Sequence, residues 1–263
     1  MGKQSRADER ESIAEGQGQD PVQAGEKDNR LNSAQRGEDS GGNSSICVLT
    51  SGGLDSGVLV AEATTHYDGV WPVFVRSGLR WEEVELFWLT RFLQSLSAPA
   101  LRPLRVLDFP LTDIYGQHWS TGGGGVPGRE APLDSVYLPG RNIILLAKAA
   151  VFCSLAGIKE IAIGTLRANP FPDASAEFFR RIGEVFSEGL AYPVRVCAPY
   201  HSLSKAEVIR LGARWPLELT FSCISPEGNH HCGLCSKCAE RHQAFVDAGI
   251  PDPTLYATNF PSS

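Results

Sequence analysis

The chain lacks the features that mark several large classes of protein. It contains no apolar run of about eighteen residues, the length that a membrane-spanning helix requires. Its 24 basic residues are outnumbered by 30 acidic ones, which argues against electrostatic binding to nucleic acid as its main activity. Residues 1–11 are charged and carry no apolar core, unlike a secretory signal. We therefore expect a cytoplasmic protein that uses no membrane and requires no nucleic acid.

Cysteine is also scarce. Seven cysteines in 263 residues are too few and too unevenly spaced for a disulfide scaffold. Four of them crowd between Cys223 and Cys238, and such crowding in a cytosolic chain indicates a metal site before disulfides. The other three, Cys47, Cys153 and Cys197, lie in apolar segments, so we expect them to pack in the core.

The first 43 residues differ in composition from the rest. They are rich in Gly, Ser, Gln and charged residues, and besides Met1 their only large aliphatic residues are Ile13, Val22 and Leu31. Such a segment buries too little apolar surface to offset its chain entropy. We therefore expect a disordered tail over residues 1–43, followed by one large domain with a small appendage.

From residue 45 onward, short apolar runs alternate with helical patterns. The runs predict strands at 46–49, 70–75, 104–107, 160–163 and 194–197, and the patterns predict helices at 57–67, 81–96, 142–155, 176–190, 204–211 and 237–248. Ser204 and Glu207 have the spacing of a capping box at the start of a helix. Alternation of this kind predicts an α/β fold with a parallel sheet covered by helices on both faces. Ligands of such sheets bind at the carboxyl ends of the strands, near a reversal of strand order.

A glycine-rich loop follows the first expected strand. After Thr50 the chain reads Ser51-Gly52-Gly53-Leu54-Asp55-Ser56, and a helix follows. Two glycines let the backbone approach an anion, and the helix terminus offers free N–H groups. No Gly-Lys-Ser/Thr ending is present, so the loop is not a Walker A motif. Asp55 would repel phosphate unless it binds Mg²⁺ or caps the helix.

The crowded cysteines have the spacing of a metal site. Cys223, Cys232, Cys235 and Cys238 are spaced C-x₈-C-x₂-C-x₂-C, and Gly233 supplies a tight turn. Four thiolates can close a tetrahedral Zn²⁺ site with no open position, which makes its role structural. An iron–sulfur cluster and redox-active thiols are the alternatives. His230 and His231 lie in the same loop, but four thiolates already suffice as ligands.

The loop at 51–56 resembles the SGGxDS motif of the PP-loop ATP pyrophosphatases. Together with the cysteine spacing, Pro139-Gly140-Arg141-Asn142 and Ser204-Lys205-Ala206-Glu207, it resembles the 7-cyano-7-deazaguanine synthase (QueC/ExsB) family over about residues 45–257. The resemblance implies a PP-loop/HUP-like Rossmannoid fold. We expect a PP-loop ATP-binding domain at 44–218 and a zinc-binding segment at 219–263 packed on it.

The resemblance also implies a reaction. The family adenylates 7-carboxy-7-deazaguanine with Mg·ATP, lets ammonia displace AMP to give an amide, and then dehydrates the amide to the nitrile. On this reading residues 50–56 bind ATP, and Asp55, Lys205 and Arg141 are catalytic. Lys205 could instead be a solvated helix start, and Arg141 a surface ion pair. Free ammonia is the expected nitrogen source, and a homodimer is a possible assembly.

Two stretches near the expected substrate pocket depart from the family pattern. Residues 76–81 keep a Gly and an Arg but lose the family's Tyr, Gln and His, and residues 164–173 keep only Pro172-Asp173. Asp173 would read a guanine-like N–H edge or cap the helix near Ala176. Phe171 would stack on a base or pack in the core. These departures leave two other hypotheses: a QueC-like enzyme that adenylates a protein or RNA, and a non-catalytic nucleotide- and zinc-binding module, against which the intact loop argues.

Overall fold

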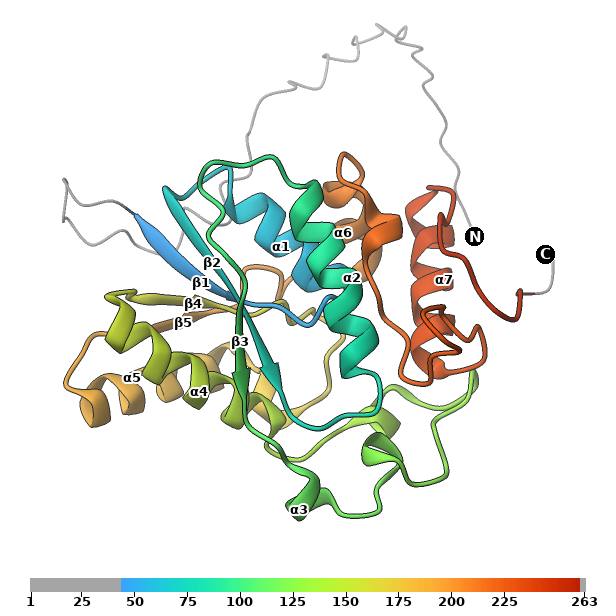
Figure 1. The fold of residues 1–263 in the computed structure, drawn as a ribbon, viewed down its shortest axis with the longest axis horizontal. Helices are drawn as coiled ribbons and strands as arrows, with labels where there is room; N and C mark the ends of the chain where they lie inside the picture. Colours follow the sequence, from blue (N-terminus) through green and yellow to red (C-terminus); the bar gives the residue numbers. More distant parts are fainter. Residues whose placement is uncertain (1–43, 261–263) are drawn as a thin grey trace, which may run out of the picture.

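The computed structural model describes residues 44–260, so the expected tail at 1–43 lies outside the described residues. Its centre is a parallel five-stranded sheet with the order β3-β2-β1-β4-β5 (Figure 1). The apolar runs form these strands as the sequence predicts, with small shifts at their ends. The strands are β1 (Ser45–Leu49), β2 (Gly69–Arg76), β3 (Arg105–Asp108), β4 (Glu160–Ala162) and β5 (Arg195–Cys197).

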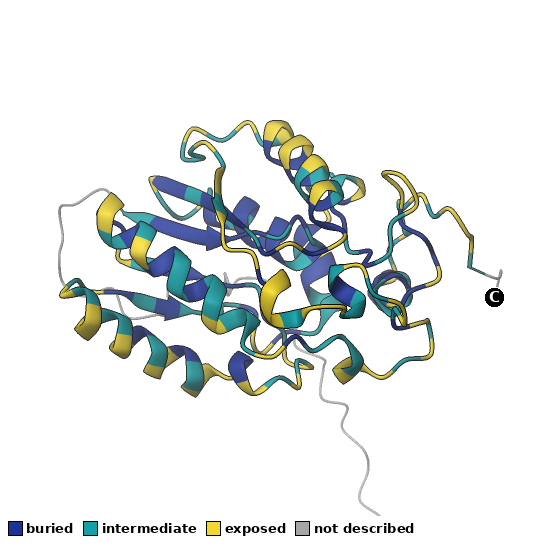
Figure 2. Ribbon diagram, turned by 60° about the horizontal axis from the view of Figure 1, so that its bottom comes forward, coloured by how far each residue is buried: buried dark blue, intermediate teal, exposed yellow. Residues whose placement is uncertain are grey.

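Helices cover both faces of the sheet, which confirms the predicted α/β architecture. Alternate residues of β1 point to opposite faces, so Ile46 and Val48 pack in one core cluster while Cys47 and Leu49 pack in another. The first cluster contains α1 (Leu54–Ala63), α2 (Glu82–Ser95), α6 (Lys205–Gly212) and α7 (Ser236–Ala248), and the second contains α4 (Arg141–Ala156) and α5 (Ala176–Leu190). Figure 2 shows buried central strands between helices whose outer faces are exposed.

The expected helices are all present, but several short ones were not predicted. These are α3 (Thr112–Tyr115) and the 3₁₀ turns η1 (Trp119–Thr121), η2 (Leu133–Val136), η3 (Pro172–Ala174) and η4 (Leu217–Leu219). The helix expected from residue 57 starts three residues earlier, at Leu54, because Gly53 already has the extended backbone of an N-cap. The capping box of Ser204 and Glu207 is confirmed at the start of α6.

The strand order reverses beside β1. From β1 the chain moves outward through β2 to β3, and it then returns to place β4 and β5 on the other side of β1. The connections after β1 and β4 therefore leave the sheet in different directions and open a crevice at its carboxyl edge. The glycine-rich loop follows β1 directly, so the fold places it at this switch point.

The carboxyl-terminal segment packs against the same edge. Helix α7 contacts α6, and its residues Ala244, Phe245 and Ala248 belong to the core cluster that contains α1. A third cluster joins the four crowded cysteines to Trp81, Leu138 and Phe221. The boundary at 218/219 stays a prediction. No helix within residues 44–260 is long and apolar enough to cross a membrane.

Candidate active site and cysteine cluster

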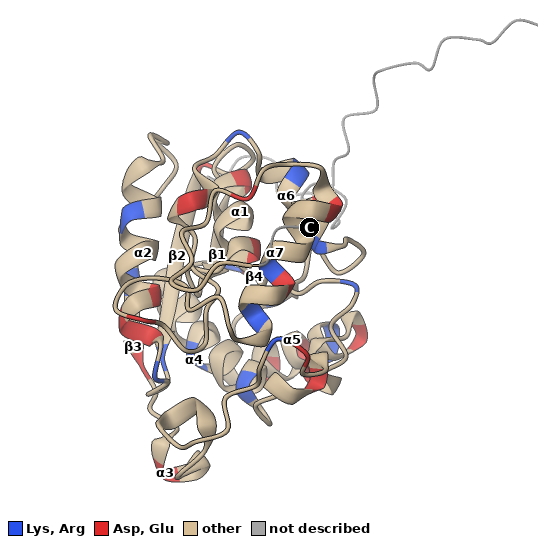
Figure 3. Cartoon of the chain, turned by 90° about the vertical axis from the view of Figure 1, so that its right-hand side faces the viewer, with Lys and Arg blue, Asp and Glu red and all other residues tan. Residues whose placement is uncertain are grey.

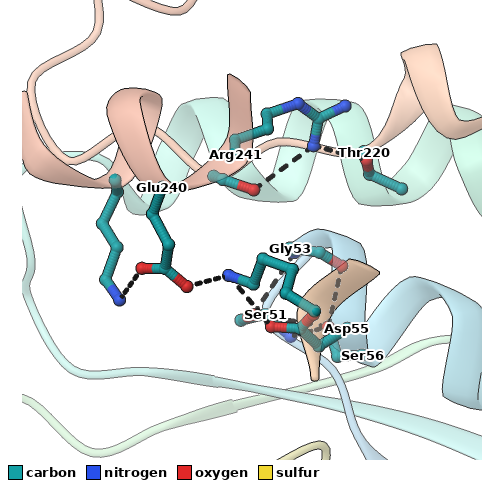
Figure 4. A network of polar contacts seen from close by, with 10 residues as sticks. Ser51, Gly53, Asp55, Ser56, Thr220, Glu240 and Arg241 are labelled. Atoms are coloured by element: carbon teal, nitrogen blue, oxygen red, sulfur yellow. Dashed lines mark hydrogen bonds and ion pairs between the residues drawn. The ribbon is translucent and has the colours of Figure 1, made fainter. Parts of the chain in front are cut away.

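The loop after β1 is shaped by its glycines and serines. Gly52 has φ +79°, and a Cβ there would lie 2.8 Å from the backbone oxygen of Glu85, so only glycine fits. The Ser51 N–H donates to Ser56 Oγ at 3.2 Å, and Ser56 Oγ donates to the Gly53 carbonyl at 3.2 Å (Figure 4). The loop is thereby closed on itself and presents its backbone to the start of α1.

Asp55 is not the cap of α1. Gly53 occupies the N-cap position and Asp55 lies in the first turn, so the capping alternative is wrong. Asp55 Oδ2 lies 3.3 Å from Lys205 Nζ, whereas Oδ1 is buried without a hydrogen-bond partner among the described residues. Burial raises the pKa of this carboxyl, and the attraction of Lys205 opposes that rise. The unsatisfied oxygen is the kind of group that a bound cation would complete.

Lys205 is the first residue of α6, but it does not point into solvent. Its side chain is 15% exposed and lies between Asp55 and Glu240 (Figure 4). The ammonium donates a hydrogen bond to Glu240. The second oxygen of Glu240 accepts from Lys237 at 2.6 Å. Burial alone would lower the pKa of Lys205, but the two carboxylates raise it above its usual value. The alternative of a solvated helix start is therefore wrong, and the catalytic role of Lys205 stays a prediction.

Arg141 opens α4 directly after Gly140, which has φ +75°. Within residues 44–260 its guanidinium forms no ion pair shorter than 4.0 Å, and its Nε is buried without a partner. The alternative of a surface ion pair is therefore wrong. Its charge still acts at a distance, because it lowers the pKa of Glu85, which burial raises well above its usual value.

Asp173 lies in η3, two residues before the N-cap of α5, but its hydrogen bonds go to the start of α4. Its Oδ2 accepts from the backbone N–H of Asn142 at 3.1 Å, and its backbone carbonyl accepts from the Asn142 side chain at 3.0 Å. The cap of α5 is Ser175, whose hydroxyl accepts from the Phe178 N–H at 3.1 Å. The alternative that Asp173 caps the helix near Ala176 is therefore wrong. Burial raises the pKa of Asp173 despite its bonds to Asn142.

Phe171 is half-buried. Its ring lies 4.9 Å from that of Tyr137, and it packs against the core cluster under α4 and α5 while also lining a cavity. The position allows both expected roles, because one face of an aromatic ring can pack on the core while the other meets a ligand.

A cavity of about 220 Å³ joins the glycine-rich loop to the start of α4. It brings together nearly all of the site residues that the sequence predicts at this edge. Its walls include Thr50, Ser51, Gly53, Asp55, Ser56, Arg141, Phe171 and Asp173. Gly52 and Leu54 do not line it, because Gly52 packs on α2 and Leu54 is buried in the core.

Two buried carboxylates line the same cavity and are not among the site residues predicted from the sequence: Glu82 and Glu85 of α2. Glu82 accepts hydrogen bonds from the backbone N–H groups of Ser77 and Gly78 and so fixes the turn after β2. Glu85 is 7% exposed, and the nearby charge of Arg141 lowers its pKa. Their signal in the sequence was three glutamates in one helical turn, of which only Glu83 is exposed.

A second cavity, of about 640 Å³, lies on the other side of Asp55. Both cavities are lined by Asp55, Gly164 and Thr165, so they meet at the carboxyl ends of β1 and β4. Basic side chains from three segments line the second one: Arg167, Lys205, Arg210 and Lys237. Figure 3 shows that basic and acidic residues alternate along α7, which borders it. Four acidic side chains line it as well, so the cavity is polar without a net excess of positive charge: Asp55, Glu207, Glu240 and Asp247.

The four cysteines converge on one point. Their Sγ atoms all lie within 4.8 Å of one another, and all four residues are buried. The Sγ separations are 3.8 Å for Cys223–Cys235, 3.9 Å for Cys232–Cys238 and 3.5 Å for Cys235–Cys238. Four thiolates around one tetrahedral ion with bonds of about 2.3 Å would lie roughly 3.8 Å apart. The residues therefore fit a single metal ion.

The surroundings of the cluster support thiolates. Cys223 Sγ accepts from the backbone N–H groups of Ser225 and Cys232, both at 3.3 Å. Gly233 has φ +75°, and a Cβ there would overlap the Thr258 carbonyl, which confirms the expected tight turn. His231 Nε2 accepts from the Ser222 N–H at 3.1 Å, so this histidine has another partner than a metal.

Cys47 and Cys153 are fully buried in the core, as expected, and Cys197 is half-buried at the edge strand.

Helix α7 links the cysteine cluster to the glycine-rich loop. It begins between Cys235 and Cys238, and its Arg241 is fully buried. This guanidinium donates to Thr220 Oγ1 and to the Leu217 carbonyl, both at 2.9 Å (Figure 4). The next residue in that segment, Phe221, donates its N–H to the Gly52 carbonyl at 2.7 Å. The segment that Arg241 fixes therefore holds the loop.

A glycine-rich loop at the switch point of a parallel sheet, with a buried lysine and aspartate beside it, is the arrangement of a PP-loop ATP-utilising fold. The chain belongs to the QueC family, because the family model described as "Queuosine biosynthesis protein QueC" matches residues 45–249.

Curated relatives agree with this family. The chain is 34% identical to the 7-cyano-7-deazaguanine synthase of Methanothrix thermoacetophila, an alignment that covers 80% of this chain and 97% of the relative. It is 33% identical to the enzyme of that name from Xanthomonas campestris pv. campestris (strain B100), over 80% of this chain and 96% of the relative. A solved U34-tRNA thiolase, NcsA from Methanococcus maripaludis, aligns with a TM-score of 0.45 and 14% identity over 79% of this chain and 68% of that one.

Proposed function

We propose that this protein is an ATP-dependent carbon–nitrogen ligase that converts 7-carboxy-7-deazaguanine and ammonia to 7-cyano-7-deazaguanine. Two observations support this assignment. The chain aligns with nearly the full length of relatives that bear this name, and its cavity joins the loop of an ATP-utilising fold to an arginine with an unsatisfied Nε. The relatives' names do not favour a protein or RNA substrate, or a non-catalytic module.

The reaction needs two activations. A substrate carboxylate oxygen attacks the α-phosphorus of ATP, and pyrophosphate leaves to give an acyl adenylate. Ammonia attacks the acyl carbon, AMP departs, and a proton is lost, which leaves the primary amide. A second ATP adenylates the amide oxygen, and loss of AMP and two protons gives the nitrile. The protein must stabilise phosphate charge and keep water from the adenylate.

We assign the nucleotide to the loop at Thr50–Ser56. Its backbone N–H groups and the start of α1 favour phosphate, and Ser51 and Ser56 offer hydroxyl donors. Asp55 would hold the Mg²⁺ that accompanies ATP, because its Oδ1 is an unsatisfied hard oxygen ligand. Lys205 would neutralise charge that develops on the departing pyrophosphate, since its ammonium lies 3.3 Å from Asp55.

We assign the deazapurine to the part of the cavity between α2 and α4. Arg141 would hold the carboxylate that is activated, because its guanidinium lines the cavity and its Nε lacks a partner. Phe171 would stack on the heterocycle. Asp173 remains the expected reader of the N–H edge, although it already binds Asn142, and Glu85 offers a second carboxylate for that edge.

We propose that the four cysteines hold one structural Zn²⁺. Their close separations suit a single tetrahedral ion better than a cluster of four irons, which would hold its thiolates farther apart. A closed site supplies no coordination position for catalysis, so the ion would stabilise the fold of the loop around it.

The test is the reaction itself. The full-length chain is incubated with 7-carboxy-7-deazaguanine, ammonium and Mg·ATP, and products are read by mass spectrometry. We expect the amide and then the nitrile, with one AMP for each step. An Arg141→Met variant should retain ATP binding and lose product, because it removes the proposed carboxylate contact and leaves the loop intact. If the wild-type chain consumes neither the acid nor the amide, the proposed substrate is wrong.

A further inference from the structure

Glu240 is a charged residue to which the proposed reaction assigns no role, although it lies in the polar network beside the loop (Figure 4). It stands on α7, two residues after Cys238, and its side chain is 24% exposed. One of its oxygens accepts a hydrogen bond from Lys205, and the other accepts from Lys237 at 2.6 Å. Helices α6 and α7 thus bring two ammonium groups to one carboxylate.

Lys205 is shared between two carboxylates. It donates to Glu240, and its Nζ also lies 3.3 Å from Asp55 Oδ2. The attraction of Lys205 is then divided between two anions, and because Lys237 pairs with Glu240, Asp55 is the one that is less than fully neutralised. Asp55 also keeps Oδ1 without a hydrogen-bond partner in the part of the chain that the structure describes. The aspartate therefore retains both negative charge and a free acceptor.

We propose that Glu240 is a positioning residue: by sharing Lys205 with Asp55, it keeps the Asp55 carboxylate available to the magnesium ion of Mg·ATP. This inference rests on the proposed function, because it takes Asp55 as the ligand of magnesium. Without the charge of Glu240, Lys205 would pair with Asp55 alone and compete with the ion for that carboxylate.

The local charge balance points the same way. Asp55, Lys205, Glu240 and Lys237 alternate in sign along the network and sum to zero. Removal of the glutamate charge leaves one excess positive charge in a partly buried site, where screening by solvent is weaker. Such a site opposes a divalent cation but not the anion of metal-free ATP. The dependence of ATP binding on magnesium should therefore fall.

Glu240→Gln tests the proposal because it keeps the size of the side chain and one oxygen acceptor while removing the charge. The quantity measured is the ratio of ATP dissociation constants in magnesium-free buffer and at saturating Mg²⁺, by calorimetry on the full chain with its cysteine-bound metal. We expect this ratio to fall about tenfold relative to the wild type. Metal content should stay at the wild-type value, and thermal unfolding of the same sample should show that the variant is folded at the temperature of the assay.

Glu160→Gln is the matched control. Glu160 is 22% exposed and forms an ion pair with Arg195, so its burial and pairing resemble those of Glu240. It lies at the amino end of β4, the opposite edge of the sheet from the loop. We expect the wild-type ratio from this variant.

A second background tests whether Glu240 acts through Lys205. In a Lys205→Gln chain, the further change Glu240→Gln should lower the magnesium ratio by much less than in the wild-type background, because the shared ammonium is already gone and only the general loss of negative charge remains. The proposal would be overturned if Glu240→Gln had its full effect in that background. It would also be overturned if Glu240→Gln alone had the wild-type ratio, or if the wild-type chain bound ATP equally with and without magnesium. The assay contains no deazaguanine, so a chain that makes no nitrile but shows the expected fall would refute the substrate and retain this inference.

Discussion

Asp55→Asn separates the two effects that a buried carboxylate has on an enzyme. The substitution keeps the shape of the side chain and removes its charge. Burial raises the pKa of Asp55 above 3.8, which means that the folded protein disfavours the charged form relative to the unfolded chain. A group with a raised pKa stabilises the fold below its unfolded pKa and loses that contribution as pH rises. At neutral pH the wild type therefore carries a penalty that asparagine lacks.

The ion pair of Asp55 with Lys205, at 3.3 Å, opposes this cost of burying the charged carboxylate. Because Lys205 keeps its bond to Glu240, loss of Asp55's charge does not leave a buried ammonium without a partner. We therefore expect the free energy of unfolding at pH 7 to change by no more than about 1 kcal/mol, or to increase. The chemical step should behave differently, because asparagine binds Mg²⁺ poorly and cannot offset the charge of the triphosphate.

We expect the rate of adenylation to fall by about 10²-fold, or roughly 2.7 kcal/mol of transition-state stabilisation. The assay is pyrophosphate release at saturating ATP, magnesium and deazapurine carboxylate, with thermal unfolding measured on the same sample. A variant that turns over at the wild-type rate would show that Asp55 has no catalytic part. A variant that unfolds would show that the carboxylate is needed for the fold, which contradicts the small change expected in the free energy of unfolding.

Two other predictions concern the cysteine cluster and the buried glutamate. Cys235→Ser removes one of four thiolates from a closed site. Elemental analysis should therefore find zinc bound below one equivalent, and the carboxyl-terminal segment should become sensitive to proteolysis. Zinc retained at wild-type affinity, or iron in place of zinc, would contradict the assignment of a structural zinc site. Burial raises the pKa of Glu85 well above 4.5, so its contribution to stability is present below that value and is lost as pH rises. Glu85→Gln should therefore gain melting temperature relative to the wild type as pH increases from about 4.5 to 8, and parallel pH profiles for the two proteins would refute the stated cause.

The parts of the fold that the sequence predicts correctly are those set by local patterns. Strands β1, β2 and β4 are apolar runs that are almost wholly buried, and such runs are readable without tertiary information, whereas the edge strand β3 is mostly exposed. The glycine-rich loop and the cysteine cluster are also local, because their residues lie close together along the chain. Errors in this class are confined to element ends, such as the start of α1 at Leu54.

The alternatives that the structure rules out, and the carboxylate that was overlooked, depend on residues that are distant in sequence. Asp173 caps the start of α4 through Asn142, 31 positions away, and no local pattern distinguishes this from a cap of the helix that follows Asp173. Lys205 occupies a position that is usually solvated, but α7 covers it with Glu240, which is 35 positions away. Glu85 was overlooked because a glutamate in the first turn of a helix is typical of an exposed residue. In each case packing between elements decides the surroundings of the side chain.

The cysteine cluster lies where it can affect the glycine-rich loop as well as the stability of the fold. A single helix, α7, starts within the cluster and carries both Glu240, which binds Lys205, and Arg241, which fixes the segment that bonds Gly52. A metal that fixes the start of α7 therefore fixes two sides of the loop at once: the charged partner of its lysine and the backbone support of its glycine. A substitution in the cluster should for this reason affect ATP binding as well as stability, even though no cysteine lines either cavity beside the loop. The cysteine cluster and the glycine-rich loop are thus connected through the contacts of two consecutive residues of one helix.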